Sequence, residues 1–220
     1  MKQIGHFIDG KQVAGTSGRT SNVYNPATGE VQATLSLASD AEILAAVESA
    51  KNAQPKWAAT NPQRRARVFF KFVELLNQNM DELATLLSSE HGKTVEDSKG
   101  DIIRGLEVCE FVCGIPHLQK GEFTEGAGPS IDMYSLRQPV GIGAGITPFN
   151  FPGMIPMWMF APAIACGNAF ILKPSERDPS LPIRLAELMM EAGLPAGILN
   201  VINGDKSAVD GLLTNPDIGA

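Results

Sequence analysis

The feature that most constrains the fold is a regular alternation of apolar strands and helices in the last third of the chain. Three short apolar stretches, VGIGAGI from Val140, AFILK and ILNVI, are predicted as strands. Helices are predicted between and after them, from about Pro152 to Ala165, from Pro179 to Ala192 and from about Asp205. Strands that alternate with helices form βαβ units around a parallel sheet. The chain is therefore predicted to have an α/β fold built on a parallel sheet with flanking helices.

The first 120 residues predict a small β region followed by four helices. Asp9-Gly10 and Thr28-Gly29 are turn signals between β-rich runs. Ser39 and Glu42 have the spacing of a capping box, which begins a helix to about Gln54. Three more helices are predicted from Pro62 to about Asn77, from Asp81 to His91 and from Thr94 to about Gly114, the last with Ile102, Ile103, Leu106, Cys109 and Cys113 on one face.

Composition excludes several classes of function. The formal net charge of -6 provides no basic surface for nucleic acid, so we expect no nucleic-acid partner. The amino terminus lacks the apolar segment of a secretory signal. The three cysteines have the spacing of neither a zinc ribbon nor a disulfide framework, and we expect them to be small buried residues of a cytoplasmic protein. The histidines have no partner at metal-ligand spacing, so we expect no metal site.

One long uncharged stretch raises the question of a membrane. Residues 138–172 contain no charged side chain. Pro152, Pro156 and Pro162 lie among glycines that divide this stretch into short pieces. We favour a buried strand, helix and strand over a membrane span and expect no membrane partner.

Two loops that follow predicted strands carry side chains suited to a binding site. Asn150 lies between the first apolar strand and its helix. Its amide can donate to an oxygen that gains negative charge during a reaction. Capping of the following helix is an equally good interpretation of this residue.

The second loop, Lys173-Pro-Ser-Glu-Arg177, follows the next strand. Glu176 can accept hydrogen bonds from ribose hydroxyls, and Lys173 can add a donor. The alternative is an exposed charged turn. Both loops are expected at the same edge of the sheet, which favours a shared site. The common dinucleotide fingerprint G-x-G-x-x-G is incomplete, because Ile146 occupies the position of its third glycine.

Longer motifs resemble the aldehyde dehydrogenase superfamily. ITPFNFP followed by WMFAPAIACGNAFILKPSER resembles that family, and the forms Phe-Asn-Phe-Pro and Lys-Pro-Ser-Glu-Arg are most similar to its methylmalonate-semialdehyde dehydrogenase branch. Asn-Pro-Ala-Thr-Gly-Glu, Trp57 with its following arginines, Gly92-Lys93-Thr94 and Pro139-Val-Gly occur in the family's order. The resemblance covers the whole chain. It departs from the family at Gly204, where many members have a second glycine two residues later.

The resemblance implies a role for several residues. Asn150 would be the oxyanion-binding asparagine. Thr147 and Phe149 would line the NAD site, Lys173 and Glu176 would bind ribose, and Arg177 would flank them. Arg104, expected on the exposed side of its helix, would bind the substrate carboxylate through a bidentate contact.

The resemblance also implies the organisation and activity of the protein. Residues 1–120 would begin the NAD-binding domain, 121–137 would form an oligomerisation arm, and 138–220 would form a truncated βαβ core, with the catalytic domain absent. The full-length enzyme would use NAD to oxidise malonate or methylmalonate semialdehyde and would transfer the acyl group to coenzyme A with loss of CO₂. A homo-oligomer is expected. The alternative is a non-catalytic dinucleotide-binding or scaffolding module.

Overall fold

The computed structural model describes residues 2–220. Its strands are β1 (Lys2–Ile4), β2 (His6–Ile8), β3 (Lys11–Val13), β4 (Thr20–Asn25), β5 (Glu30–Ser36), β6 (Phe123–Gly128), β7 (Ile131–Tyr134), β8 (Ile142–Ile146), β9 (Ala169–Lys173) and β10 (Leu199–Val201). Its helices are α1 (Asp40–Ala58), α2 (Pro62–Gln78), α3 (Met80–His91), α4 (Val95–Val112), α5 (Ile115–Leu118), α6 (Met154–Ala165), α7 (Ser180–Glu191) and α8 (Lys206–Leu213).

A five-stranded sheet in the order β3-β2-β10-β9-β8 forms the centre of the molecule. The strands β8, β9 and β10 are parallel, as their alternation with α6 and α7 predicts. The hairpin β2–β3 pairs antiparallel with the far edge of β10, through Phe7 and Val201. A second sheet, β1-β5-β4, contains the other hairpin predicted from its turn residues.

The last residues lie along the free side of β8. Gly219 N donates to Ile142 O at 2.9 Å, and Ala144 N donates to Ala220 O at 2.8 Å. The chain therefore moves from β8 to β9 to β10 in one direction and then returns through α8 to the opposite side of β8. This reversal of strand order is a topological switch point, where open α/β sheets bind ligands beyond the carboxyl ends of their strands.

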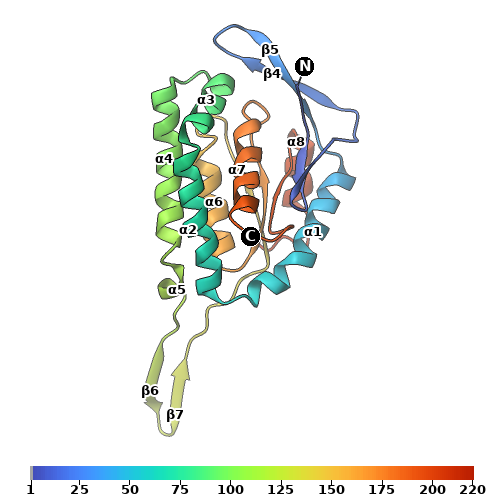
Figure 1. The fold of residues 1–220 in the computed structure, drawn as a ribbon. Coiled ribbons are helices and arrows are strands. Elements are labelled where there is room, and N and C mark those ends of the chain that lie inside the picture. The colour runs from blue at the N-terminus through green and yellow to red at the C-terminus, as the bar shows by residue number, and fades with distance from the viewer. Residues whose placement is uncertain (1) are drawn as a thin grey trace.

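Helices cover both faces of the central sheet (Figure 1). The helices α6 and α7 pack on one face and are backed by α2, α3 and α4, whereas α1 packs on the other face beside α8. The large side chains that fill the core include Phe69, Phe72 and Phe160, all fully buried. Phe72 and Phe160 meet edge to face with 6.2 Å between ring centroids, so they join α2 to α6.

Distant side chains hold both ends of α6. At its carboxyl end, four consecutive carbonyls each accept a side-chain hydrogen bond: Ile164 O from Trp57 Nε1, Ala165 O from Arg65 Nε, Cys166 O from Gln119 Nε2 and Gly167 O from Gln54 Nε2. At its amino end, the buried Asp101 Oδ1 accepts from Met154 N at 2.6 Å. These bonds satisfy backbone groups that a helix leaves unpaired at its ends.

Most predicted elements are confirmed within a few residues. Ser39 and Glu42 form the expected capping box of α1, and Gly92, with φ of 85°, ends α3. The expectation that Ile103 lies on the buried face of α4 is wrong, because its side chain is 45% exposed. Ile103 is turned by about 100° from the buried Ile102, which points it to solvent. The short helix α5 was not predicted.

Residues 121–137, predicted as an arm, form the hairpin β6–β7, which projects away from the body (Figure 1). Its apolar side chains Phe123, Ile131, Met133 and Tyr134 are all more than half exposed. No helix among residues 2–220 combines the length and apolar character needed to cross a membrane.

The contact between α4 and α6 generates a stability prediction. A Cβ added to Gly105 would lie 2.2 Å from Met157 Cε and 3.1 Å from Met157 Cβ, whereas one added to Gly100 would meet nothing closer than 3.8 Å. We expect Gly105→Ala to lower the free energy of unfolding by about 1–3 kcal/mol through overpacking. Gly100→Ala on the same helix is expected to raise it by up to about 1 kcal/mol. Urea denaturation of the chain measures both, and equal effects would contradict this account of the helix contact.

Candidate functional site

The two loops singled out in the sequence meet at one edge of the sheet. In the ladder between β8 and β9, Ile146 pairs with Lys173, the last residue of each strand. One residue further, Thr147 N donates to Lys173 O at 3.1 Å. The prediction that both loops lie at the carboxyl edge of successive strands is therefore confirmed. This edge borders the switch point beside β8.

Thr147 and Lys173 are buried polar residues at this edge. Thr147 is 4% exposed, and its Oγ1 has no hydrogen-bond partner among residues 2–220. Lys173 is 5% exposed, and its Nζ lies 3.2 Å from Glu176 Oε2. A buried hydroxyl without a protein partner is uncommon, and it marks a place where a ligand can supply the missing bond.

The Glu176 carboxylate remains accessible and ionised. Its side chain is 43% exposed, which leaves acceptor capacity beyond the bond to Lys173. Partial burial would raise the pKa of Glu176, but its own backbone N–H and the charges of Lys173 and Arg177 outweigh burial and lower it. An ionised carboxylate can accept hydrogen bonds from a diol, and the ammonium beside it can donate one in return.

Asn150 lies in the loop that joins β8 to α6, and its side chain is exposed. The capping interpretation is not what this structure contains: Gly153 is the N-cap of α6, without a side-chain hydrogen bond, and Asp101 binds the first helical N–H. The Asn150 backbone carbonyl accepts from Lys93 Nζ at 2.7 Å. No hydrogen bond occupies its side-chain amide within residues 2–220, so this amide is free to donate.

Phe149 is held between two side chains. The Arg177 guanidinium lies 4.7 Å from the centroid of the Phe149 ring, and the His91 ring stacks with it at 6.3 Å. Arg177 directly follows Glu176, so this contact connects the loop after β9 to the loop after β8. The contact between the Arg177 guanidinium and the Phe149 ring is worth about 0.5–1 kcal/mol, because cations are attracted to aromatic faces.

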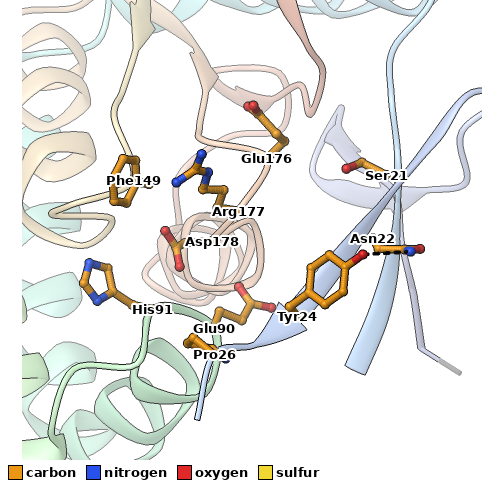
Figure 2. Close-up of a pocket in the computed structure, with 10 residues that line it drawn as sticks. All are labelled: Ser21, Asn22, Tyr24, Pro26, Glu90, His91, Phe149, Glu176, Arg177 and Asp178. Atoms are coloured by element: carbon orange, nitrogen blue, oxygen red, sulfur yellow. Dashed lines mark hydrogen bonds between the residues drawn. The ribbon is translucent and has the colours of Figure 1, made fainter. Parts of the chain in front are cut away.

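Phe149, Glu176 and Arg177 also line a cavity of about 440 Å³ together with the end of α3 and strand β4 (Figure 2). Two buried acids, Glu90 and Asp178, contribute to its wall. Glu90 accepts from Ser180 N at 3.0 Å, whereas both oxygens of Asp178 lack a partner among residues 2–220. Burial, reinforced by the Glu90 carboxylate, raises the pKa of Asp178 to about 7 although Lys93 and Arg177 oppose it.

Arg104 does not line this cavity. It is exposed on α4, as predicted, and its Nη1 donates to Gly100 O of its own helix, at 3.3 Å. Its backbone carbonyl accepts from Trp158 Nε1 at 3.1 Å, so it lies beside α6.

Cys109 is fully buried, and burial raises the pKa of its thiol, whereas Cys113 and Cys166 are only partly buried. Among residues 2–220, no three His, Cys, Asp or Glu side chains are placed to bind one metal ion.

Lys93, Asp101, His91 and Asp178 belong to this region and were not predicted as site residues. Lys93 was visible only as part of the motif Gly92-Lys93-Thr94, without a role. Asp101 is a single acid in the middle of a helix, where exposure is the default expectation. Its burial depends on the start of α6, which lies more than 50 residues later, and no local pattern encodes that contact.

Comparison with known proteins extends these observations. The model of the aldehyde dehydrogenase family matches residues 13–220. The chain is 50% identical over its full length to malonate-semialdehyde dehydrogenase of Pseudomonas aeruginosa, of which it covers 44%. It is 49% identical over 99% of its length to the acylating mitochondrial methylmalonate-semialdehyde dehydrogenase of Arabidopsis thaliana, of which it covers 36%. The chain thus spans less than half the length of these relatives.

A solved structure is also similar throughout the chain. It is that of a Sinorhizobium meliloti 1021 protein provisionally named methylmalonate-semialdehyde dehydrogenase, in complex with NAD. The TM-score is 0.98 with 83% identity over 99% of this chain and 44% of the other. The family match over nearly the whole chain, together with the fold and the two loops at the switch point, shows that this chain belongs to the aldehyde dehydrogenase family.

Proposed function

We propose that this chain is the cofactor-binding part of an NAD-dependent, coenzyme A-acylating semialdehyde dehydrogenase. The observation that carries the proposal is the pairing of Lys173 and Glu176 at the carboxyl end of β9, beside the unpartnered hydroxyl of Thr147. The NAD bound to the similar S. meliloti protein supports the choice of cofactor. The whole enzyme would oxidise malonate or methylmalonate semialdehyde, the substrates that appear in the names of its relatives.

The residues present fit a dinucleotide. Glu176 would accept hydrogen bonds from ribose hydroxyls, Lys173 would donate to a ribose oxygen, and Thr147 and Phe149 would line the cofactor site beside Arg177. NAD, when bound, supplies the acceptor for the hydride that leaves the substrate. The ammonium of Lys173 is already directed to Glu176, so binding requires little reorganisation of either side chain.

Asn150 would stabilise charge on the substrate. Its exposed amide would donate to the aldehyde oxygen as that oxygen becomes negative during attack on the carbonyl carbon. A donor fixed in advance lowers the barrier because it needs no reorientation at the moment of reaction. The attacking nucleophile would come from the part of the relatives that this chain does not cover.

The substrate, acyl acceptor and location are also proposals. Arg104 would bind the substrate carboxylate. Transfer of the acyl group to coenzyme A rests on the word acylating in the name of the A. thaliana relative. The free cysteines favour the cytoplasm. A homo-oligomer would form through the projecting hairpin β6–β7, because exposed apolar side chains on a strand pair favour association.

The cofactor assignment predicts the effect of Glu176→Ala in the family-length protein that carries this segment. We expect the dissociation constant for NAD to rise about 10- to 100-fold, because hydrogen bonds to a charged group contribute about 1.5–3 kcal/mol. Isothermal titration calorimetry measures it. Glu74→Ala is the matched control, since Glu74 also pairs with a lysine three residues earlier and has similar exposure. Unchanged NAD affinity in Glu176→Ala would remove the cofactor role of this residue.

The oxyanion assignment predicts a different effect of Asn150→Ala. In the family-length protein, the rate of the acylation step is expected to fall about 10²- to 10³-fold, while NAD affinity stays within a few-fold. Stopped-flow measurement of NADH formation in a single turnover gives this rate. A change confined to NAD affinity would show that Asn150 serves the cofactor and not the aldehyde oxygen. Asn52→Ala on α1 is a control for loss of an exposed amide.

The proposed arm predicts the effect of charge on assembly. Met133→Lys and Tyr134→Lys should shift the chain from an oligomer to a smaller species. Association would bury each lysine in the interface without a partner for its charge, which opposes assembly. Size-exclusion chromatography with light scattering measures the mass. Leu44→Lys changes an apolar residue on α1 that is as exposed as Met133 and should leave the mass unchanged. Retention of the oligomer by both arm variants would exclude this hairpin as the interface.

A further inference from the structure

Lys93 makes three contacts with the neighbourhood of Asn150. Its Nζ donates to Asn150 O at 2.7 Å and to Asp101 Oδ2 at 2.8 Å, and it lies 4.2 Å from the centroid of the Phe151 ring. The Lys93 side chain is 16% exposed and that of Asp101 is fully buried, so the ion pair between them is only weakly screened by solvent. One ammonium therefore binds the backbone of Asn150 and the ring of the residue that follows it.

Asp101 supplies the fixed point for this ammonium. The Asp101 side chain on α4 is fully buried, and each of its two oxygens accepts a hydrogen bond from a different group. Oδ2 accepts from Lys93, and Oδ1 accepts from Met154 N, the first residue of α6. The same carboxylate thus anchors Lys93 and the helix start that follows the Asn150 loop.

The arrangement holds the backbone of Asn150 and leaves its side chain free. The carbonyl of Asn150 is bound, whereas its amide has no hydrogen-bond partner within residues 2–220. A donor aimed at a developing charge needs a fixed backbone, because a misplacement of about 1 Å can cost about 100-fold in rate. The contacts of Lys93 act on the part of Asn150 that determines where its amide lies.

We propose that Lys93 is a positioning residue that acts through Asn150, with Asp101 holding Lys93 in place. This inference rests on the proposed oxyanion role of Asn150. It assigns to the motif Gly92-Lys93-Thr94 a function in catalysis that is separate from cofactor binding. A purely structural role is the competing explanation, in which loss of Lys93 lowers stability without acting through Asn150.

A double-mutant cycle in the family-length protein separates the two explanations. Lys93→Met is expected to slow the single-turnover acylation rate about 10- to 100-fold, with the dissociation constant for NAD within a few-fold of its original value. In the Asn150→Ala background, the same Lys93→Met change should cause less than a three-fold further loss. Lys93→Arg, which retains the charge and the donors, should restore most of the rate.

A second variant protects the test against unfolding. Lys93→Met leaves the buried Asp101 carboxylate without its cation, which destabilises the fold. Lys93→Met with Asp101→Asn removes both charges while the amide oxygen still accepts from Met154 N, and it should show the same loss of rate with thermal stability largely recovered. Lys99→Met, which removes another paired lysine, the one bound to Asp81 and Glu96, is the control and should leave the rate unchanged.

The outcomes distinguish this inference from the proposed function. If Asn150→Ala slows acylation and Lys93→Met does not, only the positioning role is overturned. Losses of rate that multiply in the double variant would also overturn it, because Lys93 would then act independently of Asn150. If Asn150→Ala leaves the acylation rate unchanged, both the oxyanion assignment and the positioning role fail.

Discussion

The architecture depends on the way α6 is held at both ends by side chains from other elements. Donors from α1, α2 and the segment after α5 occupy the carbonyls at its carboxyl end, and the buried Asp101 accepts its first N–H. The N-cap Gly153 supplies no side-chain hydrogen bond, and α6 carries no charged side chain in its first or last turn, so its terminal N–H and C=O groups depend on partners from other elements. In the chain, α6 comes after β8 and before β9. Its position therefore fixes the far end of the loop that follows β8. The helices of the first 120 residues thereby support a site that lies in the last 80.

Several polar groups beside the loop after β8 differ in whether they have hydrogen-bond partners. On the side of α4, Lys93 and Asp101 satisfy each other and the backbone. On the side of the sheet edge and the cavity, the Thr147 hydroxyl and the Asp178 carboxylate lack partners among residues 2–220. Proteins rarely bury unsatisfied polar groups, and water, an ion, a ligand or a catalytic role accounts for those that occur. The Lys93–Asp101 pair therefore supports the backbone of this loop, and the Thr147 hydroxyl and the Asp178 carboxylate remain available to a ligand or to water.

The sequence predicted the parts of this fold that local chemistry determines. Capping residues, turn dipeptides and helical periodicity located α1 to α4, and the alternation after Val140 located the parallel strands. The same reasoning placed Asn150, Lys173 and Glu176 near one sheet edge, because parallel strands end together. It did not find Lys93 or Asp101, whose roles arise from contacts with residues more than 50 positions away. Nor did it predict that β2 joins β10, since a strand of three residues carries too little pattern to indicate its partner.

The pairing of β2 with β10 also determines when the central sheet can be completed during folding. Phe7 meets Val201, so one edge of the central sheet joins residues separated by nearly the whole chain. During synthesis, the hairpin β2–β3 leaves the ribosome long before β10, the strand that it pairs with. The hairpin therefore waits through the synthesis of every helix from α1 to α7 before its partner strand exists, and contacts of such long sequence separation form slowly. When it docks, the hairpin covers the edge of β10, and the parallel part of the sheet can then extend only past β8, on the side of the switch point.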